Sequence, residues 1–301
     1  MKKTIERIKE LKKRKNAIIL AHSYQNIEID EVADFVGDSL YLSQMAKNTK
    51  ASIIVFAGVY FMAQTAKIIS PEKKVLLPNI NAGCLMADMI NLHQMVDFKK
   101  KYPNIPTVCY INSTAEVKSE CDICCTSSNA VEIVRSLNSE KVLFVPDANL
   151  GKYVESQLKD VEVITYKGCC PVHDKITEED ILNARKKYPN AKVLIHPECK
   201  PAISSLGDYI GSTSGIIDYV KNSSEKQFVI VTEKGVADRL KRDYPEKEFF
   251  LISNNMLCES MKLTTLEEIL YSLENEVNEI TIDENIRQLS ANCIERMLKV
   301  S

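Results

Sequence analysis

The chain has 301 residues, of which 45% are hydrophobic and 27% charged, so it can bury real cores and is not a disordered or low-complexity protein. Its 39 basic and 41 acidic residues give a net charge of −2, so a nucleic-acid partner is not expected. No apolar run reaches the roughly 18 residues of a membrane helix, and residues 1–15 form a charged amphipathic helix pattern without signal-peptide character. We therefore expect a cytoplasmic protein with no membrane partner.

The chain contains ten cysteines. A reducing compartment gives disulfides little reason to form, so packing, metal binding or catalysis must account for these thiols.

An internal repeat organises the predicted elements. The pentapeptide KKYPN at 100–104 recurs at 186–190, 86 residues later. After each copy a strand-like run ends in polar residues, and the N-terminal segment follows the same order. The first strand of each repeat ends in a polar residue: His22, Asn112 and His196. A turn that contains a serine follows each of them after 15 to 17 residues, at Ser39, Ser127 and Ser212.

The first repeat is expected to run from residue 1 to 90. It contains strand patterns at 17–24 and 52–58, a helix pattern at 40–47 after Ser39, and a closing segment, 73–86, that ends near Cys84.

The second repeat is expected at 91–177 and the third at 178–265. Strand patterns at 107–114 and 141–147, a helix at 130–137 and a closing segment with Cys170 make up the second repeat. The third has strands at 191–198 and 227–233, a helix at 216–222 and a closing segment with Cys258. Two helices at 264–277 and 285–298 form a helical tail, 266–301.

Alternating strands and helices predict an α/β fold, with three pseudo-symmetric parallel-sheet domains around a central active site. Ligands of parallel sheets bind outside the carboxyl ends of the strands. That rule places the polar strand ends, the serine turns and Cys84, Cys170 and Cys258 at the same end of their sheets.

The three cysteines lie in register, 86 and 88 residues apart. If the three domains meet with their strand ends inward, the thiols converge. Three thiolates can hold a cubane iron–sulfur cluster with one open iron, although zinc with a further ligand remains an alternative. Each serine turn before a helix can bind an anion at the helix start, so the turns predict a small polyanionic substrate.

Of the remaining cysteines, Cys109, Cys199 and Cys293 are assigned to structure, and packing is the favoured interpretation of Cys121, Cys124 and Cys125. Cys121, Cys124 and Cys125 lack a second ligand pair at zinc-site spacing, and Cys169 should point away from the site if Cys170 points into it. Their roles stay open. Cys109, Cys199 and Cys293 have no counterpart in the other repeats.

Ten segments in order along nearly the whole chain resemble the motifs of quinolinate synthases. They are LAHSYQ, ADFVGDSL, VYFMAQTAKI, GCLMA, CYINSTAEVK, CTSSNAVEIV, CCPVH, IHPEC, GSTSG and LCESMK. The resemblance implies three α/β domains around a [4Fe-4S] cluster. It also implies condensation of iminoaspartate with dihydroxyacetone phosphate to quinolinate for NAD biosynthesis, and a possible functional link to an iminoaspartate-producing enzyme.

The same resemblance implies a role for individual residues. Cys84, Cys170 and Cys258 would hold the cluster. The anchors of carboxylate or phosphate groups and other substrate contacts would be His22, Ser39, Asn112, Ser127, His173, Ser212 and Thr213. The catalytic residues would be Tyr24, Tyr110, His196 and Glu198.

His196 and Glu198 are expected to share a strand face on the proton-transfer side, with Tyr24, Tyr110 and Asn112 opposite. Two features depart from the family pattern. Cys169 replaces a common histidine, and the C-terminal CxxC of some members is absent because Cys293 stands alone.

Two other classes remain open on the sequence. Another tri-cysteine cluster-dependent (de)hydratase or lyase would share the metal site but act on a different small polyanion. A metal-free three-lobed binding protein would not need cysteines in register.

Overall fold

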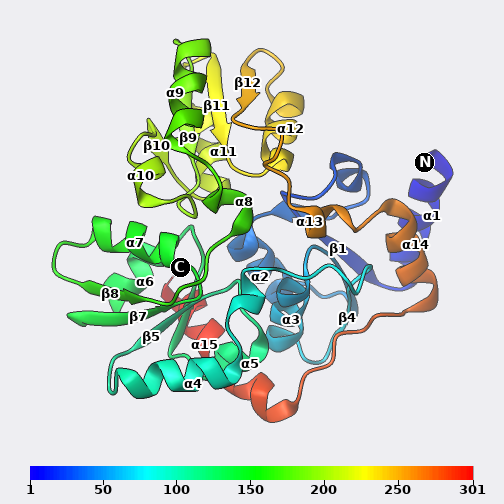
Figure 1. Cartoon of the computed structure of the whole chain (residues 1–301). Coiled ribbons are helices and arrows are strands. Elements are labelled where there is room, and N and C mark those ends of the chain that lie inside the picture. The colour runs from blue at the N-terminus through cyan, green and yellow to red at the C-terminus, as the bar shows by residue number, and fades with distance from the viewer. Residues whose placement is uncertain (301) are drawn as a thin grey trace.

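The structure is a computed structural model that describes residues 1–300. It contains three four-stranded sheets, and all pairings between the named strands are parallel. We call each sheet with its covering helices a lobe. Figure 1 shows the three lobes around a common centre, so the expected α/β architecture is confirmed.

The first lobe has the strand order β2-β1-β3-β4. Its strands are β1 (Ala17–His22), β2 (Phe35–Gly37), β3 (Ile53–Ala57) and β4 (Lys74–Leu76). Its helices are α1 (Lys2–Arg14), η1 (Ile27–Glu31), α2 (Ser39–Asn48), α3 (Tyr60–Ile69) and η2 (Ala87–Met89). The strands are mostly buried, as expected for a parallel sheet covered on both faces.

The second lobe repeats this order as β6-β5-β7-β8. Its strands are β5 (Thr107–Tyr110), β6 (Ile123–Cys125), β7 (Lys141–Val145) and β8 (Glu162–Thr165). Its helices are α4 (Leu92–Lys101), α5 (Ala115–Ser119), α6 (Ala130–Ser136), α7 (Ala148–Gln157) and α8 (Pro171–Asp174).

The third lobe has the order β10-β9-β11-β12. Its strands are β9 (Lys192–Ile195), β10 (Tyr209–Ile210), β11 (Gln227–Val231) and β12 (Glu248–Leu251). Its helices are α9 (Glu178–Lys187), α10 (Pro201–Ser204), α11 (Thr213–Asn222), α12 (Lys234–Asp243) and α13 (Glu259–Lys262).

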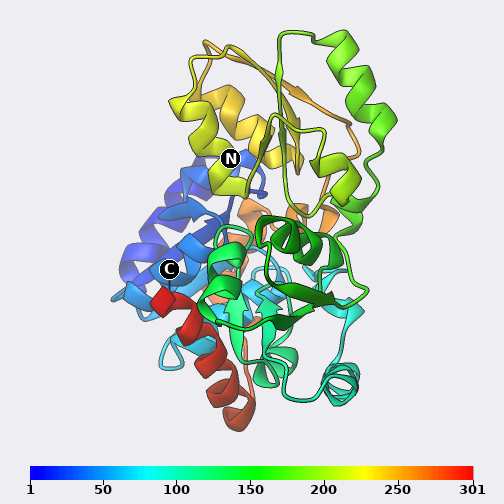
Figure 2. The same cartoon turned by 90° about the vertical axis from the view of Figure 1, so that its left-hand side faces the viewer.

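The two predicted tail helices are present as α14 (Leu266–Asn275) and α15 (Glu284–Val300). Helix α14 packs on α1, whereas α15 packs on α5, β6 and α3. In Figure 2 the red helix α15 accordingly runs beside the first and second lobes. The two tail helices thus pack against the first and second lobes.

The hydrophobic core follows the same division. One cluster of buried side chains is shared by the first lobe, the second lobe and α15. A second cluster lies under α1 and α14 on the other face of the first sheet. The third lobe has two clusters largely of its own, one for each face of its sheet. The strands of the three sheets fall in three successive parts of the chain, but the predicted boundaries 1–90, 91–177, 178–265 and 266–301 stay predictions.

Two local expectations need correction. The edge strands β2, β6 and β10 were not predicted, because two or three residues are too short to show a strand period. The serine turns also differ from one another. Ser212 caps α11, but Ser39 is the first residue of α2 behind the cap residue Asp38, and Ser127 precedes α6 by three residues.

Among residues 1–300, no helix has both the length and the apolar character needed to cross a membrane.

Candidate active site

A cavity of about 420 Å³ lies where the carboxyl ends of the strands of all three lobes meet. Thirteen of the fourteen predicted site residues line it, and Ser212 is the exception. The thirteen are His22, Tyr24, Ser39, Cys84, Tyr110, Asn112, Ser127, Cys170, His173, His196, Glu198, Thr213 and Cys258. The pseudo-symmetry of the chain therefore brings segments more than 200 residues apart to one point.

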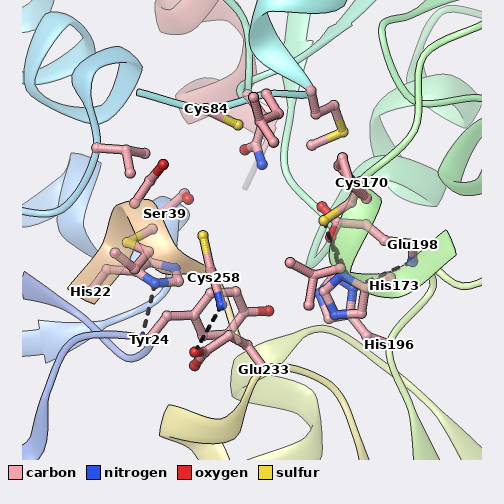
Figure 3. Close-up of a pocket in the computed structure, with 18 of the residues that line it drawn as sticks. His22, Tyr24, Ser39, Cys84, Cys170, His173, His196, Glu198, Glu233 and Cys258 are labelled. Carbon is pink, nitrogen blue, oxygen red and sulfur yellow. Dashed lines mark hydrogen bonds and ion pairs between the residues drawn. The ribbon is translucent and has the colours of Figure 1, made fainter. Parts of the chain in front are cut away.

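The three in-register cysteines follow the last strand of their respective sheets, β4, β8 and β12. Figure 3 shows the sulfur atoms of Cys84, Cys170 and Cys258 directed into the same cavity from different sides. Burial raises the pKa of all three thiols, that of Cys84 to about 12. Because burial disfavours an isolated thiolate, three such thiols facing one space are suited to a bound cation that stabilises their ionised form.

Glu198 is the centre of a buried hydrogen-bond network. Its Oε1 accepts a 2.7 Å hydrogen bond from the hydroxyl of Tyr110, and its Oε2 lies 2.8 Å from Nδ1 of His173 and 3.7 Å from Nδ1 of His196. Burial opposes ionisation of this carboxyl, but His196, His173 and the Tyr110 hydroxyl lower its pKa to about 2. The group is therefore a carboxylate that accepts from the Tyr110 hydroxyl and lies within hydrogen-bond distance of the His173 ring.

The network continues to the first lobe. Nε2 of His173 lies 2.9 Å from the hydroxyl of Thr232, which lies 3.1 Å from the hydroxyl of Tyr24. Thr213 donates a further hydrogen bond of 3.2 Å to the Tyr24 hydroxyl. A chain of hydrogen-bonded side chains thus connects Tyr24 with Tyr110 along the cavity, and each lobe contributes residues to it.

This geometry corrects the expected sides of the site. Tyr110 does not lie opposite Glu198 but donates directly to it, because β5 and β9 end at the same place. The reason given for the proximity of His196 and Glu198 was also wrong. Strand β9 ends at Ile195, and a turn brings the two side chains together, with the Glu198 N–H 3.3 Å from Nδ1 of His196.

One group of side chains could hold a metal ion as it stands. The ligand atoms of Cys170, His173 and Glu198 all lie within 4.8 Å of one another, and Nδ1 of His173 is 3.2 Å from the sulfur of Cys170. The rings of His173 and His196 stack at 4.8 Å, which fixes the orientation of both.

The serine turns form another part of the cavity wall, which we call the serine wall. Ser39, Ser127 and Thr213 line the cavity at or near the starts of α2, α6 and α11. Ser212 lies behind them and accepts the N–H of Gly215 as the cap of α11. Residues at or near the starts of three helices therefore line one space, and the partial positive charge of helix starts suits phosphate or carboxylate groups.

Two further features are matched to a polar ligand. The side-chain oxygen of Asn112 is buried without a hydrogen-bond partner among residues 1–300, and Asn112 lines the cavity. His22, at the end of β1, is buried and accepts the N–H of Tyr24 at 3.1 Å on its Nδ1. Burial lowers the pKa of His22 to about 4 and that of His196 to about 3, so both rings are neutral near pH 7.

Sequence reasoning missed three contributors. Asp38 lines the cavity and accepts from hydroxyls of the other two lobes, and its place before Ser39 as a helix cap was a signal that could have identified it. Glu233 follows β11 at the polar strand end of the run 227–233. Its carboxylate accepts the N–H of Cys258 at 3.3 Å and pairs with Lys262 at 3.1 Å. Thr232 carried no signal of its own.

The other seven cysteines do not line this cavity. Cys169 is partly exposed next to Cys170, whereas Cys109, Cys124, Cys125, Cys199 and Cys293 are buried. Within residues 1–300 no two cysteines form a disulfide.

Comparison with known proteins gives one consistent result. The family model described as quinolinate synthetase A protein matches residues 6–299. Among curated proteins, the quinolinate synthase of Alkaliphilus metalliredigens is 51% identical over 296 residues, which cover 98% of both chains. Those of Clostridioides difficile and Methanosarcina barkeri are each 49% identical, over 98% of this chain and 97% of the relative.

Proposed function

The chain belongs to the quinolinate synthase family, and from this premise we propose that it condenses iminoaspartate with dihydroxyacetone phosphate to quinolinate, releasing phosphate and water. The product would enter NAD biosynthesis. The observation that carries the proposal is the convergence of Cys84, Cys170 and Cys258 with three helix-start turns in one cavity. The cytoplasmic location and the link to an iminoaspartate-producing enzyme stay predictions.

The donor set fits a [4Fe-4S] cluster. Three partly buried thiols that face one cavity are the soft ligands that iron–sulfur clusters take, and one from each lobe leaves a fourth position for substrate. We therefore assign Cys84, Cys170 and Cys258 as its ligands. When bound, the cluster supplies a Lewis-acidic iron that activates a substrate oxygen or nitrogen.

Substrate anions would be held by the serine wall. Ser39, Ser127 and Thr213 offer hydroxyls at the positive ends of helices, while the unpartnered Asn112 oxygen offers an acceptor to a substrate N–H or O–H. This arrangement suits one phosphate ester and one dicarboxylate.

Proton transfer would be carried by the Glu198 network. The reaction isomerises a triose, forms an imine and sheds water, so groups must both take and return protons. The Tyr110 hydroxyl and the His173 ring each share a proton with the Glu198 carboxylate at 2.7 and 2.8 Å. His196 and Tyr24 border the same cavity and complete the set that orients the substrate.

The experiment is an anaerobic preparation assayed for iron, sulfide and quinolinate formation. We expect about four irons and four sulfides per chain, with a brown chromophore that disappears in Cys84→Ala, Cys170→Ala and Cys258→Ala. Cys199→Ala is a matched control because Cys199 is a buried thiol outside the cavity. Iron-loaded protein that makes no quinolinate would favour the alternative cluster-dependent lyase acting on another polyanion.

The close group of Cys170, His173 and Glu198 favours a second candidate, a zinc-dependent enzyme. A zinc ion bound by these three residues would leave Cys84 and Cys258 without a role. Metal analysis separates the two, since zinc at one equivalent in an active, colourless protein would overturn the cluster assignment.

A further inference from the structure

A second group of cysteines lies in the second lobe, outside the cavity described above. Cys109 is on β5, Cys121 follows α5, Cys124 is on β6 and Cys293 is on α15. The sulfur atoms of Cys124 and Cys293 are 3.1 Å apart although the two residues are separated by 169 positions in the chain. Both side chains are buried, at 0% and 1% exposure.

The separation of the two sulfurs is close to a bonding distance. A disulfide bond is about 2.05 Å long, so a movement of about 1 Å along the line between the sulfurs would suffice. The two residues sit on elements that pack directly against each other, β6 and α15. No rearrangement of the fold is needed to bring these thiols together.

A buried lysine provides the electrostatic setting. Lys118 is fully buried, donates to the carbonyl of Ser113 and lies 5.6 Å from the ring centre of Phe61. Among residues 1–300 it forms no ion pair with a carboxylate, although an unpaired buried ammonium is costly.

The Cys109 thiol lies next to this lysine and to Cys124. Burial alone would raise its pKa, but hydrogen bonds with Cys121 and Cys124 and the positive charge of Lys118 lower it well below the ordinary value. The same positive charge helps to stabilise the sulfur anion that a reaction of these thiols must form.

We propose that Cys124 and Cys293 are an oxidative modification site, at which a peroxide forms a disulfide that ties α15 to β6. The Cys124 thiol loses its proton while its sulfur attacks one peroxide oxygen, the O–O bond breaks, and the departing hydroxide takes that proton to become water. The sulfur of Cys293 then displaces the second oxygen, which leaves as water with the Cys293 proton. Two thiols thus lose two electrons and two protons, and one peroxide takes them up to give two molecules of water.

Hydrogen peroxide is the oxidant class that suits these positions. It is small and uncharged, and the partly exposed Cys121 stands at the edge of the group. The disulfide would fasten the helix that packs on both the first and the second lobe. Its expected effect is a stiffer attachment of the tail.

The test is peptide mapping of the anaerobic holoenzyme after treatment with hydrogen peroxide, with free thiols blocked before unfolding. Trypsin releases residues 119–135, which carry Cys121, Cys124 and Cys125, and residues 288–296, which carry only Cys293. We expect these peptides to be joined. In Cys125→Ser and in Cys121→Ser the link should persist, whereas Cys124→Ser should lose it.

Stability provides a second readout. The oxidised wild-type protein should melt about 5 °C or more above the reduced form, reversibly with dithiothreitol, since the bridge closes a long loop. Cys293→Ser should show no such rise, and Cys125→Ser should keep it. A free Cys293 thiol in wild-type protein, under conditions that oxidise the partly exposed Cys169, would overturn the proposal. So would a link from Cys293 to a cysteine other than Cys124.

Discussion

The carboxylate of Asp38 in the first lobe accepts a 2.6 Å hydrogen bond from the hydroxyl of Ser214 in the third. The same oxygen accepts from Ser128 of the second lobe at 2.7 Å, while the other oxygen caps α2 through the N–H of Tyr41. One side chain therefore joins the three turns that form the serine wall. The arrangement also places a negative charge where the substrate's anionic groups are proposed to bind.

Replacing Asp38 should separate these two effects. Asp38→Ala removes the cap and both hydrogen bonds between lobes, so the free energy of unfolding should fall by about 2 to 4 kcal/mol. Asp38→Asn keeps a cap and removes the charge, so it should lose less stability and bind inorganic phosphate more tightly than the wild type. Denaturant unfolding and calorimetric titration measure the two quantities.

Thr265→Ala is the matched control for this pair. Thr265 caps α14 through Glu268 but joins no lobes, so its loss should cost about 1 kcal/mol and leave phosphate binding unchanged. Equal stability loss in Asp38→Ala and Thr265→Ala would show that the contacts between lobes contribute nothing.

The sequence was most informative where one signal was repeated three times. The ends of β1, β5 and β9 and the three closing cysteines could be predicted because each lobe carries the same order of strand, turn and cysteine. The fold class followed from the same repetition. Residues without a counterpart in the other repeats, such as Asp38, had only a local capping signal.

Contacts between side chains of different lobes could not be predicted from the sequence, for a physical reason. Tyr110 and Glu198 are 88 positions apart, and nothing in their local patterns says that their side chains meet at 2.7 Å. The expected opposition of Tyr110 and Glu198 was wrong because the site is formed between strands of different sheets, which bring the two side chains together. Glu233 was missed for a similar reason. It follows the end of β11, but its carboxylate accepts the N–H of Cys258, which lies 25 positions later in the chain.

Glu233 should hold the loop that carries Cys258. Its buried carboxylate accepts the N–H groups of Cys258 and Gly235 and pairs with Lys262, which in turn donates to the carbonyl of Tyr24. Glu233→Ala leaves the partly buried Lys262, whose side chain is 18% exposed, without its carboxylate partner, so we expect a loss of about 2 to 3 kcal/mol in unfolding free energy and a lower iron content. Iron and sulfide assays with denaturant unfolding measure both.

Lys234→Ala serves as the comparison, because Lys234 pairs with Asp238 at an exposed site on the same helix. It should change stability by less than about 1 kcal/mol and leave the iron content alone. Full iron loading in Glu233→Ala would contradict a role in positioning Cys258.

The tyrosine next to Glu198 should affect turnover more than structure. Tyr110→Phe removes the hydroxyl that donates at 2.7 Å, and Glu198→Gln removes the carboxylate that holds the network. We expect kcat for quinolinate formation to fall by about 100-fold or more in each, with iron content unchanged.

Tyr153→Phe is a suitable control for this substitution, since Tyr153 lies outside the cavity and is only partly buried. Its kcat should match the wild type. Wild-type turnover in Tyr110→Phe would remove that hydroxyl from the proposed proton transfers.

The pH dependence of stability should report His22. Its buried ring is neutral in the folded protein, with a pKa of about 4 against an ordinary value of 6.5, so below pH 6.5 only the unfolded chain takes up the proton. The free energy of unfolding should therefore fall as the pH drops from 6.5 to 4, by about 3 kcal/mol for this residue, and stay level above 6.5. His22→Gln should show a shallower decline in unfolding experiments across this range. Because the comparison is a difference between two profiles, contributions from groups that do not interact with His22 cancel, and identical slopes for wild type and His22→Gln would show that His22 carries no such shift.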